Sequence, residues 1–343
     1  WYNRALILLS GSMFERTGNY GVKSLTRSTI FLAFGALLWL QPVDAAQRRS
    51  IGLPFYTIET DHFRINYHRG LHRVAKETGA ILERLYSIYQ DTYRLTLPDK
   101  TEVVVLDDDR PSGFAFPNFN MIAIWANDMD FNLRGTHDWL EDVVTHEYAH
   151  IVSIWSSFKL PPWMVYMQGG YFSHPNETGL RTEALHVFAG DILPPWFYEG
   201  IAQFESSLHG SDRWDTHRDM ILRTLTVSNS LLSWDHMSVF TGQGDDFEKT
   251  YNHGFSMIRY IHESYGYEAI VSILRESAKF FRLNFDGGIR QVLGISGRDL
   301  YRDWKQWLEQ RYSAQIAEIG KQVYGRKINK EGYDNRWPRF SPD

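Results

Sequence analysis

The sequence predicts an α+β protein in which a small mixed sheet with one long helix is followed by a mainly helical region. Two observations predict this class. Segments with strand character and one long helical segment fall before residue 128, whereas the segments after it have helical spacing. The length of 343 residues, of which 43% are hydrophobic and 22% charged, is typical of a folded globular protein.

The N-terminal elements follow from their side-chain patterns. Residues 62–67 alternate between apolar and polar side chains, which predicts a half-buried strand. Apolar side chains recur at helical spacing over residues 71–93 and predict one long helix. Residues 102–106 and 121–125 are runs with β-branched side chains that predict two more strands. The order strand–helix–strand–strand differs from repeated βαβ units and favours an α+β fold.

After residue 128 the periodicity is mainly helical. Helices are predicted over residues 138–155, 196–208, 217–226, 251–265, 267–281 and 298–319. Two Pro-Pro-Trp triplets, beginning at Pro161 and Pro194, bracket a stretch rich in Gly and aromatic residues that we expect to be a long loop or hairpin. We therefore expect an α+β subdomain over residues 46–133 and a helical subdomain over residues 134–325.

The composition excludes several classes of site. The chain has no cysteine, which excludes a disulfide scaffold, a thiolate zinc site and a cysteine nucleophile. Its net charge of −5 argues against a chain-wide nucleic-acid surface, so no nucleic-acid partner is expected. Thirteen histidines remain as nitrogen ligands. Any bound transition metal must therefore be held by imidazole and carboxylate groups.

Residues 1–45 have the pattern of a signal peptide with an upstream segment. Lys23 and Arg27 precede an apolar run over residues 30–40, and Ala45 and Ala46 are small residues suited to a cleavage site. A helix of eleven residues rises about 16 Å, which is short of the roughly 30 Å of a bilayer core. We expect an exported protein in the periplasm or cell envelope of a bacterium, without an integral membrane span after cleavage.

The clearest chemical motif is His146-Glu147-Tyr148-Ala149-His150. On a helix, residues four apart share a face, so both imidazoles can bind one Zn²⁺ ion. Glu147 can then act as the general base that accepts a proton from water at the metal's open position. The alternative is a pair of core histidines satisfied by hydrogen bonds.

A third ligand is available in Trp196-Phe197-Tyr198-Glu199-Gly200-Ile201-Ala202, where Glu199 lies 49 residues after His150. Pro194 and Pro195 mark the start of its helix, and the small residues Gly200 and Ala202 allow helices to approach closely. Two histidines and one carboxylate leave one coordination position for water. The alternative for Glu199 is an acid favoured by the dipole at the start of a helix.

Together these two segments resemble the gluzincin metallopeptidases, whose pattern is H-E-x-x-H, a spacer and W-x-x-E-G-x-A on a second helix. The resemblance covers roughly residues 55–310. It implies a zincin-like fold, a Zn²⁺ cofactor bound by His146, His150 and Glu199, and Glu147 as the catalytic base. The activity it implies is hydrolysis of peptide bonds in a peptide or protein substrate.

The resemblance also assigns weaker roles, with one departure. In thermolysin-like members an acid one turn after the Glu ligand orients a metal-bound histidine, but Gln203 stands at that position here. Gln203 and Asp142, the latter one turn before His146, are therefore the candidates for supporting the ligands. Tyr251 resembles the family's tyrosine that stabilises the oxyanion, with His253 as its rival and core packing as the alternative for either ring.

The family usually holds an extended peptide against an edge strand. Residues 114–125 are the candidate, with Phe119, Met121 and Ala123 as substrate-binding residues by β-augmentation. The alternative is an ordinary sheet edge protected by Pro117.

The last residues, Trp337-Pro338-Arg339-Phe340-Ser341-Pro342-Asp343, resemble the opening P-x-F-S-P-D of a TolB-like propeller blade. Residues 326–343 are therefore expected to be a linker and the start of a β-propeller, a partner within the same polypeptide. The alternative is an exposed Pro-rich tail.

The leading functional hypothesis is thus a secreted zinc metallopeptidase. Two alternatives stay open. The first is a non-catalytic binding or scaffold module of the cell envelope with a structural metal site. The second is a zinc amidase that acts on a non-protein amide, because the motif specifies activation of water and not the acyl group.

Overall fold

The computed structural model describes residues 54–107, 112–127, 138–159, 193–212, 216–239, 245–321 and 325–326. All of these residues belong to the unit that begins at Pro54. The predicted signal peptide, the predicted loop or hairpin after Pro161 and the predicted start of a propeller fall in segments outside the description. The boundaries proposed at residues 133 and 325 stay predictions.

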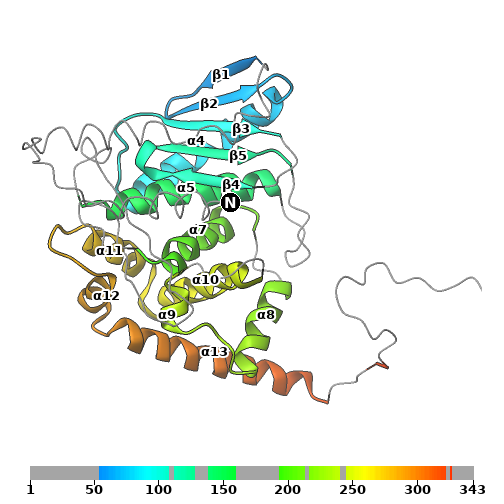
Figure 1. Ribbon diagram of the computed structural model, residues 1–343, viewed down its shortest axis with the longest axis vertical. Helices are drawn as coiled ribbons and strands as arrows, with labels where there is room; N and C mark the ends of the chain where they lie inside the picture. Colours follow the sequence, from blue (N-terminus) through cyan, green and yellow to red (C-terminus); the bar gives the residue numbers. More distant parts are fainter. Residues whose placement is uncertain are drawn as a thin grey trace, which may run out of the picture. The chain divides into compact units, whose positions relative to one another are not determined.

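The predicted α+β class is confirmed, because a five-stranded mixed sheet precedes a mainly helical region (Figure 1). The strands are β1 (Phe55–Glu59), β2 (Phe63–His68), β3 (Thr101–Leu106), β4 (Gly113–Phe116) and β5 (Met121–Trp125). Their order in the sheet is β1-β2-β3-β5-β4. The central pairs β2–β3 and β3–β5 are parallel, and the pairs at both edges are antiparallel. The edge strand β1 was not predicted, and all of β4 except Gly113 falls within the predicted edge strand over residues 114–125.

The helices are α4 (His72–Tyr93), α5 (Trp139–Ser157), α7 (Pro195–His209), α8 (Thr216–Val227), α9 (Trp234–Met237), α10 (Asp245–Tyr265), α11 (Tyr267–Ser277), α12 (Phe285–Leu293) and α13 (Gly297–Ile319), with a 3-10 turn, η1, over Pro117–Phe119. From the sheet outward, α5, α7, α10 and α13 follow one another in Figure 1. The short helices α9 and α12 were not predicted. No helix among the described residues is long and apolar enough to cross a membrane.

The two faces of the sheet differ as the alternation predicted. Phe63, Ile65 and Val103 are fully buried on the face covered by α4 and α5. The Phe63 ring lies 5.1 Å from that of Tyr148 on α5 and 6.3 Å from that of Tyr86 on α4. Because both helices contact the same phenylalanine, they cover the same face of the sheet.

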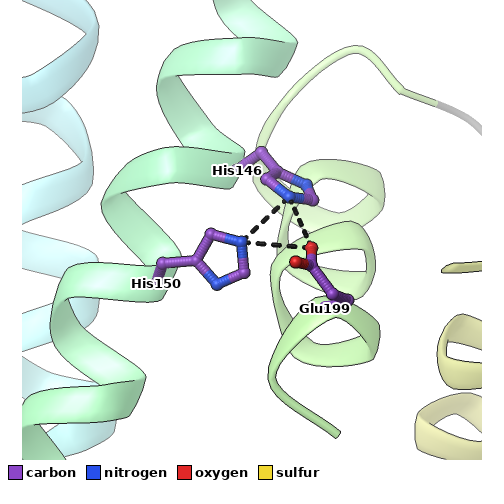
Figure 2. Close-up of side chains that lie close together, drawn as sticks. All are labelled: His146, His150 and Glu199. Carbon is purple, nitrogen blue, oxygen red and sulfur yellow. Dashed lines mark hydrogen bonds and ion pairs between the residues drawn. The ribbon is translucent and has the colours of Figure 1, made fainter. Parts of the chain in front are cut away.

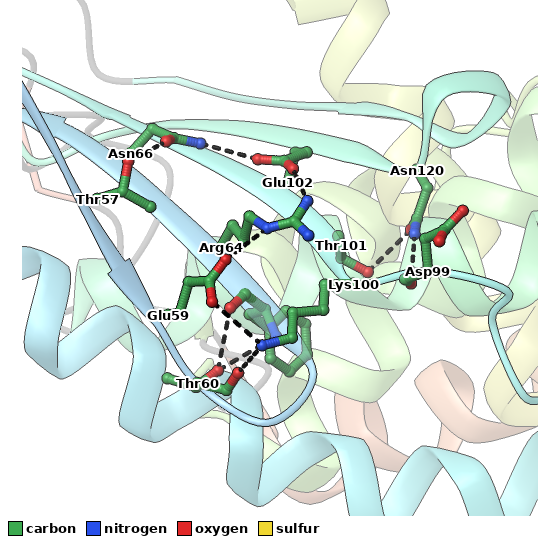
Figure 3. Close-up of polar contacts among 11 residues, drawn as sticks. Thr57, Glu59, Thr60, Arg64, Asn66, Asp99, Lys100, Thr101, Glu102 and Asn120 are labelled. Atoms are coloured by element: carbon green, nitrogen blue, oxygen red, sulfur yellow. Dashed lines mark hydrogen bonds and ion pairs between the residues drawn. The ribbon is translucent and has the colours of Figure 1, made fainter.

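The opposite face carries a polar network across β1, β2 and β3 (Figure 3). Arg64 donates hydrogen bonds of 2.7 Å to both Glu59 and Glu102. Asn66 donates to the second oxygen of Glu102 at 2.9 Å and accepts from Thr57 at 2.8 Å. These cross-strand pairs suit a solvated surface, so the hydrophobic core lies on the helix side of the sheet.

Helix α5 is fixed to the sheet near both of its ends. The indole N–H of Trp139 donates to the carbonyl of Trp125 at 2.8 Å, and that of Trp155 donates to the carbonyl of Pro117 at 2.6 Å. At its start, the Asp138 carboxylate accepts from the backbone N–H of Glu141, which caps the helix. The segment between the two tryptophans contains the His-Glu-x-x-His motif.

Helices α7 and α10 cross in backbone contact. A Cβ atom added at Gly200 would lie 2.5 Å from the carbonyl carbon and oxygen of Gly254, a separation that real side chains do not reach. Gly200 was expected to permit close helix packing, and its partner is α10. Because Glu199 precedes Gly200, this contact helps to set the position of a predicted ligand.

A buried carboxyl group lies where α4, α7 and α11 meet. Glu205 is 1% exposed and accepts hydrogen bonds from the phenols of Tyr93, at 2.7 Å, and Tyr267. Its second oxygen lies 3.5 Å from Nε2 of His209. Burial raises the pKa of Glu205 to about 7, although the two phenol donors act in the opposite direction.

The predicted helix over residues 267–281 is wrong at its end, because α11 ends at Ser277. Lys159, which follows α5, lies at this point. Its ammonium group donates hydrogen bonds to the carbonyls of Ser277, Lys279 and Arg282. A contact from a residue more than 100 positions away thus overrides the local helical spacing.

Gly200→Ala should lower the free energy of unfolding by roughly 1–3 kcal/mol, because the added methyl group overpacks the crossing of α7 and α10. Gly79→Ala on α4 is the matched control, since its Cβ would meet only side-chain atoms at 3.3 Å or more and alanine favours helix. Urea unfolding of both variants measures the difference. Equal stability of the two variants would contradict the close crossing.

Glu205→Gln should remove a pH dependence of stability. The folded state keeps the Glu205 proton up to a pKa of about 7, whereas the unfolded carboxyl loses it near 4.5, so wild-type stability falls as the pH rises through this window. Relative to the variant, wild type should lose about 3 kcal/mol between these values. Urea unfolding between pH 5 and 8 checks this, and parallel curves for the two proteins would refute it.

Candidate metal centre

Helices α5 and α7 bring the three predicted ligands together. His146 and His150 lie one turn apart on α5, and both turn toward Glu199 in the first turns of α7 (Figure 2). Pro195 occupies the first turn of α7, where its missing N–H leaves no donor unsatisfied. The side chains of His146, His150 and Glu199 are only 15%, 8% and 9% exposed.

The three ligand atoms form a nearly equilateral triangle. Nε2 of His146 lies 3.1 Å from Nε2 of His150, and each nitrogen lies 3.2 Å from Oε2 of Glu199. Ligand atoms bound tetrahedrally to one ion at about 2.0–2.1 Å lie about 3.3 Å apart. The donor set and its spacing therefore fit a metal ion. Among the described residues, this is the one group of three such side chains whose ligand atoms converge.

The charges of the triad also suit a cation. Burial would raise the pKa of Glu199, but His150 and His146 lower it to about 2, so the carboxylate is ionised. Burial would lower the pKa of His150, yet the charges of Glu199 and Glu147 raise it above its usual value. A proton therefore competes with a metal ion for the His150 nitrogen.

Glu147 lies beside the triad and against the sheet. Burial raises its pKa to about 8, an effect that His150 opposes and Glu199 reinforces. The backbone N–H of Ala115 on β4 donates a hydrogen bond to the Glu147 carboxylate. A Cβ atom at Gly113 would overlap the Glu147 side chain, so this strand position requires glycine.

Within the described part of the chain no strand pairs with the outer side of β4, so β4 is the sheet edge beside Glu147, which corrects the predicted edge strand over residues 114–125. That segment forms two strands joined by η1, and β5 is interior, because β3 pairs with one side of it and β4 with the other. Met121 and Ala123 therefore have no free strand edge. Phe119 lies in η1 and is 66% exposed. Whether these three side chains touch a substrate stays a prediction.

The direction of the free edge follows from the ladder between β4 and β5. The N–H of Trp125 donates to the carbonyl of Ser112 at 3.0 Å, which makes these two residues a hydrogen-bonded pair. Antiparallel pairs alternate, so Gly113 and Ala115 direct their backbone N–H and C=O groups away from β5. The same two residues face Glu147.

Two tyrosines flank the histidines. The ring of Tyr251 on α10 stacks on His146 with centroids 6.1 Å apart, and that of Tyr198 on α7 meets His150 edge-on at 5.8 Å. His253, the alternative to Tyr251, is fully buried. Its Nδ1 bonds to the carbonyl of Lys249, and its Nε2 accepts a hydrogen bond from the N–H of Leu232. His253 is therefore a core residue, and burial lowers its pKa to about 4.

The predicted supporting residues Asp142 and Gln203 contact the turn after α7. Asp142 accepts hydrogen bonds from the backbone N–H of Ser211 at 2.7 Å and from its hydroxyl at 2.8 Å. Gln203 donates to Asp212, which also pairs with the buried Arg218. These contacts fix α5 and α7 to one turn. Orientation of the metal ligands by either residue stays a prediction.

Sequence reasoning missed Gly113, Ala115 and Gly254. A signal for the first two exists, because small residues alternate with phenylalanines in Gly113-Phe114-Ala115-Phe116, which is typical of a strand with one closely packed face. Gly254 carried no local signal, since its role depends on Gly200 from another helix.

Comparison of the sequence with known protein families finds no match, and comparison with curated proteins finds no relative. The interpretation of the site therefore depends on its geometry and on the motifs themselves.

Glu199→Gln should weaken metal binding on the order of 100-fold or more, because the variant loses the charged ligand while its shape is kept. Glu205→Gln, another buried change on α7, is the matched control and should bind as wild type does. Competition with a chelating indicator measures the affinity, which should fall as the pH drops from 8 to 6 and His150 takes up its proton. Equal affinities for Glu199→Gln and wild type would exclude this site.

Proposed function

We propose that this chain is a zinc-dependent peptidase. The observation that carries the proposal is the placement of Glu147 between a convergent His146–His150–Glu199 triad and β4, the strand that forms this edge of the sheet among the described residues. This arrangement supports a reaction in which a base, a metal ion and an extended substrate meet. The resemblance to gluzincins in both motifs gives the same assignment.

Each residue has a stated role in this proposal. His146, His150 and Glu199 hold the ion, and zinc bound there supplies Lewis acidity that acidifies water and polarises a carbonyl. Glu147 takes the proton from the attacking water and delivers it to the leaving amine. A dication next to Glu147 favours its ionised form and so lowers the raised pKa to a value suited to a base.

Tyr251 is the proposed oxyanion donor. Its ring stacks on His146, and a phenol can donate a hydrogen bond to negative charge that develops on the substrate oxygen. Burial of Asp142 and Gln203 at 6% and 2% exposure supports a role in holding α5 and α7 rather than in touching substrate.

The edge strand β4 is the proposed substrate site. A peptide that extends the sheet would pair with the outward backbone groups of Gly113 and Ala115. The Ala115 N–H is already hydrogen-bonded to Glu147, so the Ala115 carbonyl is the group that would accept a hydrogen bond from the substrate. An edge of this kind favours a polypeptide over the small amide of the amidase alternative, which has no extended backbone to pair.

The wider context belongs to the same proposal. A signal peptide over residues 1–45 would export the enzyme to the bacterial periplasm or cell envelope, and a propeller that starts near residue 337 would be attached to the catalytic unit. Neither segment is among the described residues.

Glu147→Gln should reduce hydrolysis of a peptide library by about 10²–10⁴-fold while the protein keeps one zinc ion, because the base is lost and the ligands are not. Product formation by mass spectrometry and metal content by elemental analysis are measured on the same sample. Glu141→Gln, also on α5 but paired with Arg84 at the surface, is the control and should keep full activity.

Unchanged turnover in Glu147→Gln would exclude Glu147 as the base. A wild-type protein that holds zinc but cleaves no peptide would favour the non-catalytic binding module instead.

A further inference from the structure

An exposed apolar loop joins α11 to α12. Within it, Phe281 is 89% and Leu283 79% exposed, the two highest values among the large hydrophobic side chains of the described residues. Phe280 is 61% exposed, and its ring stands perpendicular to that of Phe281 at 5.2 Å. Three large apolar side chains thus project from residues 279–283, which we call the 279–283 loop.

Part of the backbone of the 279–283 loop is hydrogen-bonded within the protein. Lys159 donates to the carbonyls of Ser277 at 3.0 Å, Lys279 at 3.2 Å and Arg282. The N–H of Arg282 donates to the Lys279 carbonyl at 2.9 Å. These contacts tie the loop to Lys159, which follows α5, and the carbonyls bonded in this way need no water. That is a requirement for backbone that enters an apolar medium.

Cations surround the base of the loop. Lys159, Lys279 and Arg282 lie there with one acid, Glu276, which pairs with both Lys279 and Arg282. The Lys279 side chain is 61% exposed, whereas those of Arg282 and Glu276 are 26% and 16% exposed, so Lys279 is the cation of this group that reaches furthest into solvent. Apolar tips above a cationic base match the order of a membrane surface, with acyl chains inside and anionic headgroups outside.

We propose that the 279–283 loop binds the surface of an anionic lipid bilayer, with Phe280, Phe281 and Leu283 inserted at the headgroup boundary. The three exposed side chains lie within four consecutive positions of one loop, so they can enter a fluid interface together. A protein partner would need a broader complementary patch. The proposal does not depend on the peptidase assignment, so each can fail alone.

The absence of cysteine allows a local test in the full chain. Leu283→Cys, labelled with a polarity-sensitive dye, reports only on this loop and not on the apolar run at residues 30–40. The probe is a vesicle of phosphatidylcholine with or without phosphatidylglycerol. We expect a blue shift and increased emission with the anionic vesicles, and a weaker response at high salt because the cationic contribution is screened.

The matched control is Val227→Cys, which places the same dye on another exposed apolar position, 61% exposed at the end of α8. This dye should not respond to vesicles. Adding Phe280→Ser and Phe281→Ser to the Leu283→Cys protein should weaken the vesicle response by about tenfold or more.

Two outcomes would overturn the proposal. One is a Leu283→Cys dye that does not respond to either vesicle. The other is a response that appears without lipid as the protein concentration rises, which would assign the loop to contact between two copies of the chain.

Discussion

The contact between Gly200 and Gly254 is the constraint on which the geometry of the candidate site depends. It lets α7 and α10 touch through their backbones, with Glu199 directly before one glycine and Tyr251 one turn before the other. A single contact between α7 and α10 therefore fixes the positions of the carboxylate and the phenol relative to each other. Functional groups of this kind must be held within about 0.5 Å of their productive positions, and packed helices do this better than loops.

The second organising feature is a pair of buried glutamates whose pKa values are shifted in opposite directions. The pKa of Glu199 lies at about 2 and that of Glu147 at about 8, although both side chains are almost fully buried. Two histidines stabilise the ionised form of Glu199. Glu147 instead faces the apolar sheet and has a single N–H donor. Titratable groups separated in this way are typical of sites that divide the roles of charge holder and proton carrier. The neighbouring helices α5 and α7 thus supply both groups, Glu147 and Glu199.

How much of this could be predicted depends on the range of each interaction. His146 and His150 lie four residues apart on one helix, and Glu199 follows a Pro-Pro entry, so local spacing was sufficient for all three. The edge strand β4 has only four residues, and its sequence Gly113-Phe114-Ala115-Phe116 lacks the polar alternation of a surface strand. The end of α11 at Ser277 was equally hidden, because Lys159 from a distant segment binds the carbonyl of Ser277 and those of Lys279 and Arg282 beyond it. Elements set by tertiary contacts leave no local periodicity to detect.

The two indole hydrogen bonds from α5 have a mechanical consequence. Trp139 and Trp155 bond the two ends of the helix to Trp125 of β5 and to Pro117 in the turn after β4, so His146, His150, Glu147 and the β4 edge are held together as one packed body. Glu199 and Tyr251 belong to a second body, built from α7 and α10. A metal ion bound by His146, His150 and Glu199 would therefore connect the two bodies. A metal ion bound there would add to the hydrogen bonds by which Asp142 already joins α5 to the turn after α7, and would further restrict movement between Glu147 and Tyr251.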